Sequence, residues 1–273
     1  VRRVASRLVA FAPRHPLIHR WKYSLTAHGV IALSQAVRRV LLDAGVPEER
    51  IEVIEPGIEM PPQVVNAEAR AKARARWGFT GDEFVIGHVA AFTREKGQDV
   101  ALEAAGLLAS QLPRARMLLA GDGPERSSTA MVALAARAAR IAQMPGFIED
   151  LDGFYAALDL YIMPSRSEAW GLTALRAMAC GLPVVASDVG GLAEVVEPGK
   201  SGWLVEAESA GALADAIVDA ASDRERLAEM GRSARQRAEQ FSIERTVERT
   251  EQFYLRLLAD TGKETMENSA QAR

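Results

Sequence analysis

Short apolar runs alternate with longer amphipathic stretches along most of the chain, which predicts strands that alternate with helices. The run GVIALS at residues 29–34 has turn-like flanks and predicts a buried strand. A helix is predicted to follow it, because Ser34 can cap the start, apolar residues recur at helical spacing and Gly45 can end it. The run IEVIEPG at 51–57 predicts another short strand.

The pattern changes at the proline pair Pro61–Pro62, after which a charged helical stretch begins. Such a stretch between two regions of strands and helices is typical of a linker. The end of the chain has helical patterns and then a polar tail with little to bury. We therefore expect five parts: a first domain (1–60), a linker (61–80), a second domain (81–240), a separate helix (241–259) and a flexible tail (260–273).

Strand and helix patterns alternate most regularly in the second domain. Strands are predicted at the runs FVIGHVAAF, ARMLLAG, LDLYIMPS and PVVAS, with helical patterns between them. Short turns between alternating strands and helices imply a parallel sheet covered on both faces. The sequence therefore predicts a doubly wound α/β domain.

In such a domain, ligands bind beyond the carboxyl ends of the strands. This rule selects four loops, each of which contains at least one glycine. They are FTREKG after the first strand, GDGPE after the second, PSRSEAWG after LDLYIM and SDVGG after PVVA.

The loop PSRSEAWG leads into a helix that is predicted to begin near Trp170 or Gly171. The first N–H groups of a helix lack intrahelical partners and attract phosphate, and Gly171 lets a ligand approach the backbone. The Glu168 carboxylate, just before this helix, can accept hydrogen bonds from sugar hydroxyls. The same carboxylate can equally serve only to cap the helix, and the sequence leaves both interpretations open.

The loop FTREKG carries two cations, Arg94 and Lys96, where a strand meets a helix. Lys96 is a candidate counter-charge for a diphosphate, with an ordinary surface lysine as the alternative. The motifs GxxxxGK[ST], GxGxxG and GxSxG are absent, which argues against a P-loop nucleotidase, a nicotinamide enzyme and a serine hydrolase. The four histidines, His15, His19, His28 and His88, do not suggest a metal site.

Composition narrows the class of protein further. The chain has 273 residues, a net charge of −3, 48% hydrophobic and 25% charged residues, which is typical of a globular protein and not of a nucleic-acid binder. Cys180 is the only cysteine, so no disulfide forms within the chain, as expected in the cytoplasm. No apolar run reaches the ~18 residues of a membrane span, and no signal sequence is visible.

The first part of the chain has a charge of its own. Residues 1–42 contain eight basic and no acidic residues. The simplest interpretation is a solvated basic face. Peripheral contact with the inner face of a membrane, or with an anionic acceptor, is the alternative.

Taken together, these blocks resemble a known family. The segments FTREKG, LLAGDGPE and 146–206 are similar in order and spacing to the nucleotide-sugar domain of retaining GT-B glycosyltransferases of family four. The upstream segment from Gly29 resembles the last strand, helix and crossover of that family's N-terminal domain. The resemblance covers about residues 20–255 and implies a GT-B fold with a Rossmann-like C-terminal domain. Because the chain begins with Val1 and the rest of the N-terminal domain is absent, we expect a truncated chain.

The resemblance also implies roles for particular residues. Lys96 corresponds to the lysine that contacts the donor diphosphate, and Glu168 to the first glutamate of the E-x7-E motif, which contacts sugar hydroxyls. These two are the expected catalytic residues. The expected donor-binding residues are Arg94, Gly121, Gly123, Phe147, Ile148, Trp170, Gly171, Leu172, Thr173 and Arg176.

Two positions depart from the family pattern. Arg176 stands where the second glutamate of E-x7-E usually contacts the donor ribose, and an arginine cannot accept from hydroxyls. The loss of an acceptor for buried hydroxyls would cost ~1–3 kcal/mol per unmatched group. Ala90–Ala91 replaces a frequent Gly-Arg pair, and we expect Arg94 to supply the missing charge.

The function implied is transfer of a sugar, with anomeric retention, from a UDP-, GDP- or ADP-sugar to an acceptor hydroxyl. No metal or other cofactor is expected. The expected acceptor is a glycan or a lipid-linked saccharide, in cell envelope polysaccharide biosynthesis. The alternative, favoured by Arg176 and by the truncation, is a degenerate module that binds nucleotide without turnover. A sugar-nucleotide epimerase is disfavoured.

Overall fold

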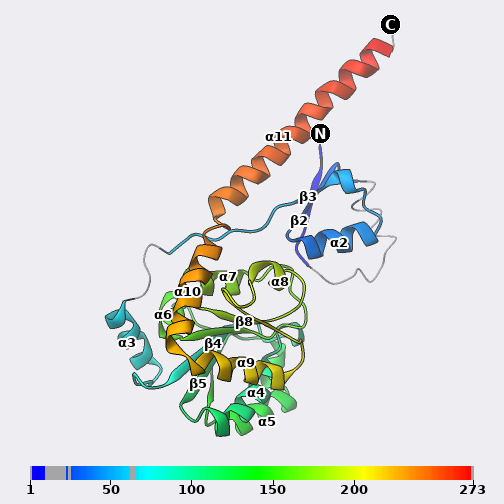
Figure 1. Ribbon diagram of the computed structural model, residues 1–273. Coiled ribbons are helices and arrows are strands. Elements are labelled where there is room, and N and C mark those ends of the chain that lie inside the picture. Colours follow the sequence, from blue (N-terminus) through cyan, green and yellow to red (C-terminus); the bar gives the residue numbers. More distant parts are fainter. Residues whose placement is uncertain (1, 10–22, 24–25, 62–65, 272–273) are drawn as a thin grey trace. The chain divides into compact units, whose positions relative to one another are not determined.

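The computed structural model describes residues 2–9, 23, 26–61 and 66–271, with side chains up to Ala259 (Figure 1). The chain divides into two compact units. Unit 1 comprises Val1–Glu59 and Phe241–Arg273, and unit 2 comprises Met60–Gln240.

Unit 1 contains a small parallel sheet with the strand order β1-β2-β3. Ser34 caps the helix after β2, since its hydroxyl accepts from the Val37 amide at 3.1 Å, as the sequence predicts. The predicted strand at 51–57 is shorter in the structure, where β3 ends at Val53. The elements are β1 (Val4–Arg7), β2 (Gly29–Ala32), α2 (Gln35–Asp43), η2 (Glu48–Arg50), β3 (Ile51–Val53) and α11 (Ile243–Gln271).

The two ends of the chain share one small core in unit 1. Phe253 of α11 is 6% exposed and packs with Ile31 and Ile54. Gly29 leaves room for this ring, because a Cβ atom there would lie 2.5 Å from Phe253 Cζ. The hydroxyl of Thr246 accepts from the Gly57 amide at 2.7 Å. The C-terminal helix is therefore an integral part of unit 1.

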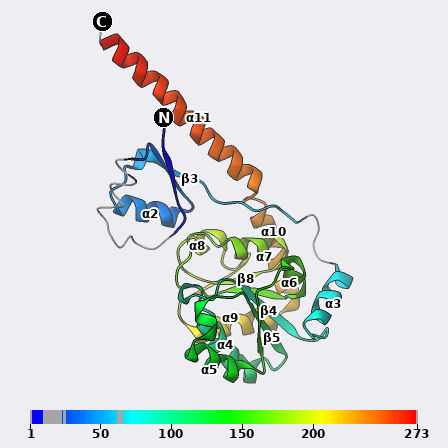
Figure 2. The ribbon, with the colours of Figure 1, turned by 180° about the vertical axis from the view of Figure 1, so that it is seen from behind.

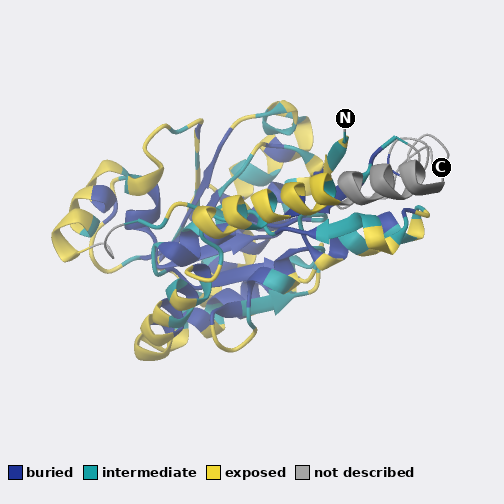
Figure 3. Cartoon of the chain, turned by 90° about the horizontal axis from the view of Figure 1, so that it is seen from above, coloured by how far each residue is buried: buried dark blue, intermediate teal, exposed yellow. Residues whose placement is uncertain are grey.

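Unit 2 is built on a six-stranded parallel sheet with the order β6-β5-β4-β7-β8-β9. Its central strands are almost completely buried, as a sheet covered on both faces requires (Figure 3). The strands are β4 (Phe84–Val89), β5 (Ala115–Ala120), β6 (Ala142–Gly146), β7 (Leu160–Met163), β8 (Val184–Ser187) and β9 (Gly202–Val205).

Helices cover both faces of this sheet (Figures 1 and 2). One face forms the main core, in which Ile86, Leu119 and Ile162 pack with residues of α4, α5 and α9. Alternate strand residues, such as Tyr161, are buried on the other side. The helical elements are α3 (Ala67–Arg76), η3 (Arg94–Lys96), α4 (Gln98–Gln111), η4 (Pro124–Ser127), α5 (Thr129–Ala138), α6 (Leu151–Ala157), α7 (Leu172–Ala179), α8 (Leu192–Val195), α9 (Ala210–Ser222) and α10 (Arg224–Ala238).

The predicted doubly wound α/β fold is confirmed, with strands at each of the four predicted runs of the second domain. The sequence pattern did not predict β1, β6, α6 or β9. The expected linker contains α3, and α11 continues to Gln271 through the expected tail. The exact division into five parts stays a prediction.

Candidate functional site

The strand order of unit 2 reverses between β4 and β7. From β4 the chain proceeds outward to β5 and β6, and then returns to the other side of β4 with β7. Loops that follow β4 and β7 therefore leave the carboxyl edge of the sheet on either side of the reversal point, where open α/β sheets have the crevice that binds ligands. These are the loops that carry Lys96 and Glu168.

Lys96 and Glu168 contact each other directly at this reversal point. The Lys96 Nζ atom donates to Glu168 Oε2 at 2.6 Å, although the two residues are 72 positions apart. The side chains are 28% and 13% exposed. The pair is thus partly desolvated yet open to a ligand, and it brings together the two residues that the sequence predicts as catalytic.

Arg166 holds these two loops together, and sequence reasoning missed it. Its guanidinium donates to both carboxylate oxygens of Asp99, at 2.9 and 2.7 Å, and to Glu208 at 2.7 Å. It also donates to the Arg94 carbonyl at 2.8 Å. These acceptors raise the pKa of Arg166, with the hydrogen bond to Asp99 as the largest cause. Arg166 therefore fixes the loop of Glu168 against the loop of Lys96.

Glycines allow the loops at this edge to approach one another. Gly97 has φ 69°, and a Cβ atom there would lie 1.9 Å from the Pro164 carbonyl oxygen. Gly121 has φ 124°, and its Cβ would lie 1.9 Å from the Ala90 oxygen. A Cβ atom at Gly123 would lie 2.5 Å from the Phe92 carbonyl oxygen. Gly121 and Gly123 thus pack the β5 loop onto the β4 loop.

The start of α7 lies immediately after Glu168. Gly171 is the N-cap residue, has φ 105° and provides no capping side chain. The first-turn amides, including those of Leu172 and Thr173, therefore have no intrahelical partner. Trp170 is 2% exposed, so only its backbone is placed to contact a ligand. Glu168 thus bonds to Lys96 and comes just before these amides in the chain.

Arg176 lies one turn further along α7 and faces a different partner. Its guanidinium donates to Asp152 of α6 at 2.9 Å, and the side chains are 29% and 78% exposed. This hydrogen bond is the main cause of a raised pKa at Arg176. The ion pair of Arg176 is thus with Asp152, a neighbour that the sequence did not indicate.

The remaining predicted residues lie around the same edge. Phe147 directly follows β6 and is 75% exposed. Ile148 lines a hollow of about 320 Å³ with Trp77 and Phe154. Arg94 is exposed, and its guanidinium has no hydrogen-bonded partner among the described residues. β6 is two strands from β4, so Phe147 lies roughly 10 Å from the crevice.

His88 lies beneath the crevice, within β4. It is fully buried, its Nδ1 atom is 3.0 Å from the Ile162 oxygen, and its Nε2 atom has no hydrogen-bond partner among the residues that the structure describes. Burial lowers its pKa to about 4. His88 is therefore neutral near pH 7 and contributes no charge to the site.

Two features are absent from the described residues: a metal site and a membrane-spanning helix. Within the described ranges, no group of three His, Cys, Asp or Glu residues is placed to hold a metal ion. In the same ranges, no helix has both the length and the apolar character that a bilayer span requires. Burial raises the pKa of the Cys180 thiol to about 11, which makes a nucleophilic role unsuitable.

Known proteins resemble the chain in sequence. Residues 69–237 match the family model of glycosyl transferases group 1, and residues 7–60 match that of glycosyltransferase family 4. The D-inositol 3-phosphate glycosyltransferase of Gordonia bronchialis is 36% identical over 230 residues, which are 78% of this chain and 49% of that protein. The enzyme of the same name from Mycolicibacterium smegmatis is 37% identical over 219 residues, 77% of this chain and 48% of its own length. The chain thus spans about half the length of these curated relatives.

Solved structures agree with this match. Anabaena Alr3699/HepE, in complex with UDP and glucose, has a TM-score of 0.82 at 27% identity, over 92% of this chain and 71% of its own. Sucrose-phosphate synthase from Thermosynechococcus elongatus has a TM-score of 0.77 at 29% identity, over 90% and 62%. The fold is accordingly of the GT-B glycosyltransferase type, as the sequence predicts. Because the group 1 model alone covers more than half of the residues, the chain belongs to the glycosyl transferases group 1 family.

Proposed function

We propose that this chain carries the donor site of an enzyme that transfers a sugar from a nucleoside diphosphate sugar to an acceptor hydroxyl, with retention and without a metal ion. The observation that carries the proposal is the Lys96–Glu168 pair at the reversal of strand order, 2.6 Å apart and beside the uncapped start of α7. A cation, a carboxylate and free helix amides match a diphosphate joined to a sugar.

Each group has a distinct part in the proposed reaction. The diphosphate gains negative charge as it leaves, and Lys96, Arg94 and the α7 amides stabilise that charge. When Lys96 turns to the diphosphate, the Glu168 carboxylate is released to accept from sugar hydroxyls. Protein cations thus take the part that a divalent ion has in other transferases, which is why we propose metal independence. No side chain is proposed as a covalent nucleophile.

The exposed Phe147 is proposed as a surface for the nucleotide base, and Gly121 and Gly123 as the backbone beside the donor. The similar Anabaena structure holds UDP and glucose, which makes a UDP-hexose the first donor to test. A glycan or a lipid-linked saccharide remains the proposed acceptor. The curated relatives are named for D-inositol 3-phosphate, so this compound belongs among the acceptors tested. Contact of residues 1–42 with a membrane stays a prediction, and 10–22 lie outside the described residues.

The alternative is a module that binds nucleotide without turnover. The Arg176–Asp152 pair favours it, because the arginine is held by Asp152 and offers no acceptor for donor hydroxyls. Calorimetry with UDP, GDP and ADP distinguishes a nucleotide binder from an empty fold. Incubation with UDP-glucose and acceptor in excess chelator, followed by NMR of the anomeric proton, tests transfer, retention and metal independence together. Binding without transfer by the whole protein would leave the module as the function.

A further inference from the structure

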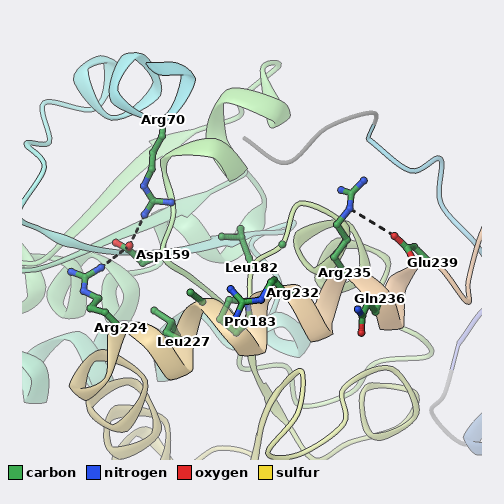
Figure 4. Close-up of a pocket in the computed structure, with 13 residues that line it drawn as sticks. Arg70, Asp159, Leu182, Pro183, Arg224, Leu227, Arg232, Arg235, Gln236 and Glu239 are labelled. Carbon is green, nitrogen blue, oxygen red and sulfur yellow. Dashed lines mark hydrogen bonds and ion pairs between the residues drawn. The ribbon is translucent and has the colours of Figure 1, made fainter. Parts of the chain in front are cut away.

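A hollow of about 540 Å³ lies at the amino edge of the six-stranded sheet, opposite to the edge that carries Lys96 and Glu168 (Figure 4). Asp159 and Pro183, which directly precede β7 and β8, both line it. Its other walls come from α10 and from Arg70 of α3. All these residues belong to unit 2, and none belongs to the proposed donor site.

The floor of this pocket is apolar. Leu182 and Leu227 are each 6% exposed and lie beside Pro183. α10 packs closely here, because a Cβ atom at Gly231 would lie 2.3 Å from the Gly181 oxygen. The floor therefore suits a flat or apolar body and offers few hydrogen-bond partners to a sugar.

The charged residues that line the pocket are four arginines and only two carboxylates. At one end Asp159, whose side chain is 5% exposed, accepts from Arg70 at 2.5 Å and from Arg224 at 2.9 Å. Arg74, 6% exposed, approaches the other oxygen of Asp159 at 2.5 Å. Three guanidinium groups thus share one carboxylate, which leaves an excess of positive charge. The pKa of Arg70 is lowered, mainly by burial and further by Arg74 and Arg224.

The other end carries two more cations. Arg235 donates to the Pro61 carbonyl at 2.9 Å and also to that of Ala179, while Glu239 lies 3.9 Å away. Arg232 is exposed, and its guanidinium has no hydrogen-bonded partner in the part of the chain that the structure describes. Arg232 is consequently available to an anion at the rim.

We propose that this pocket binds a small organic phosphate with an apolar or aromatic body, at a site separate from the donor crevice. The phosphoryl group would compensate the excess charge of Arg70 and Arg224, whose planar guanidinium groups suit phosphate oxygens, and Arg232 would add a contact at the rim. The apolar body would cover Leu182 and Leu227. The volume lies within the range of small-molecule sites.

The test uses the full chain, saturated with UDP to occupy the donor crevice, and calorimetry with three probes. Phenyl phosphate combines both features of the ligand, inorganic phosphate lacks the body and benzyl alcohol lacks the charge. Phenyl phosphate is expected to bind at least about tenfold more tightly than either of the other probes. Equal binding of phenyl phosphate and inorganic phosphate, or no binding of phenyl phosphate, would overturn the proposal.

Variants locate the binding. Ala228 is exposed on α10 and lines the pocket, so Ala228→Glu introduces a negative charge at little cost to the helix. This variant should weaken the binding of phenyl phosphate by about tenfold or more. Arg232→Gln should weaken the same binding by about threefold to tenfold. Arg140→Gln, which removes an exposed arginine outside the pocket, and Lys96→Met should leave this affinity unchanged. Unaltered affinity in Ala228→Glu with an unchanged melting temperature, or loss of binding in Lys96→Met, would place the ligand elsewhere.

Discussion

Replacing Lys96 with methionine tests whether the ammonium group at the end of η3 binds a diphosphate. A hydrogen bond to a charged group contributes ~1.5–3 kcal/mol. Lys96 must leave Glu168 to make it, and the exposed fractions of 28% and 13% show a pair that is only partly desolvated. The net loss of binding free energy should therefore be about 1–2 kcal/mol, which raises the Kd of UDP roughly 5- to 30-fold.

Calorimetry with UDP and with uridine isolates the contribution of the phosphates. Lys96→Met should raise the Kd of UDP by this factor and leave the Kd of uridine, which has no phosphate, unchanged. The double variant Lys96→Met/Glu168→Gln removes the unpaired carboxylate and shows how much of the loss comes from repulsion by Glu168. Lys200→Met is the matched control, since that side chain is 76% exposed and precedes β9, at the amino edge of the sheet and away from Lys96. An equal loss for uridine and UDP, or no loss for either, would refute the assignment of Lys96 to the diphosphate.

Three further predictions concern stability, each measured by urea denaturation. Burial lowers the pKa of His88 to about 4, so between pH 6.5 and 4 only the unfolded chain takes up this proton. The free energy of unfolding should therefore be at its full value above pH 6.5 and fall by about 3 kcal/mol on acidification, a fall that His88→Gln should lack. Asp159→Asn leaves buried guanidinium charge uncompensated and should lower the free energy of unfolding by ~3–5 kcal/mol. Asp150→Asn, at an exposed ion pair, should lower it by less than ~1 kcal/mol, and equal losses would contradict the argument from burial. Gly97→Ala and Gly78→Ala both place alanine at positive φ, which should lower the free energy of unfolding by ~1–2 kcal/mol each. Of the two, only the Cβ atom at Gly97 would have backbone atoms within 4 Å, so Gly97→Ala should cost more and should also weaken the binding of UDP.

Local patterns were sufficient to predict the central part of the fold. Apolar runs with turn residues at both ends predicted β4, β5, β7 and β8, because these strands are buried on both faces. β6 has the sequence AQMPG, whose proline and partial exposure give neither alternation nor a continuous apolar run. Its place in the sheet comes from pairing with β5, which no local pattern encodes.

The site divides in the same way. Lys96 and Glu168 could be predicted, since each lies in a loop after a predicted strand and the carboxyl ends of parallel strands share an edge. Arg166 could not, because its role depends on acceptors 67 and 42 residues away. The Asp152 partner of Arg176 was equally hidden, because it required the unpredicted helix α6. The roles of the individual site residues in donor binding stay predictions.

The split composition of unit 1 has a consequence for how the protein is made. The Gly57 amide is hydrogen-bonded to Thr246, 189 residues later, and Phe253 completes the core around Ile31. A ribosome synthesises all of unit 2 before it produces α11, so unit 2 can fold while the first strands still lack their covering helix. During that interval the nascent chain presents an unpaired apolar surface, which is the kind of surface that chaperones protect.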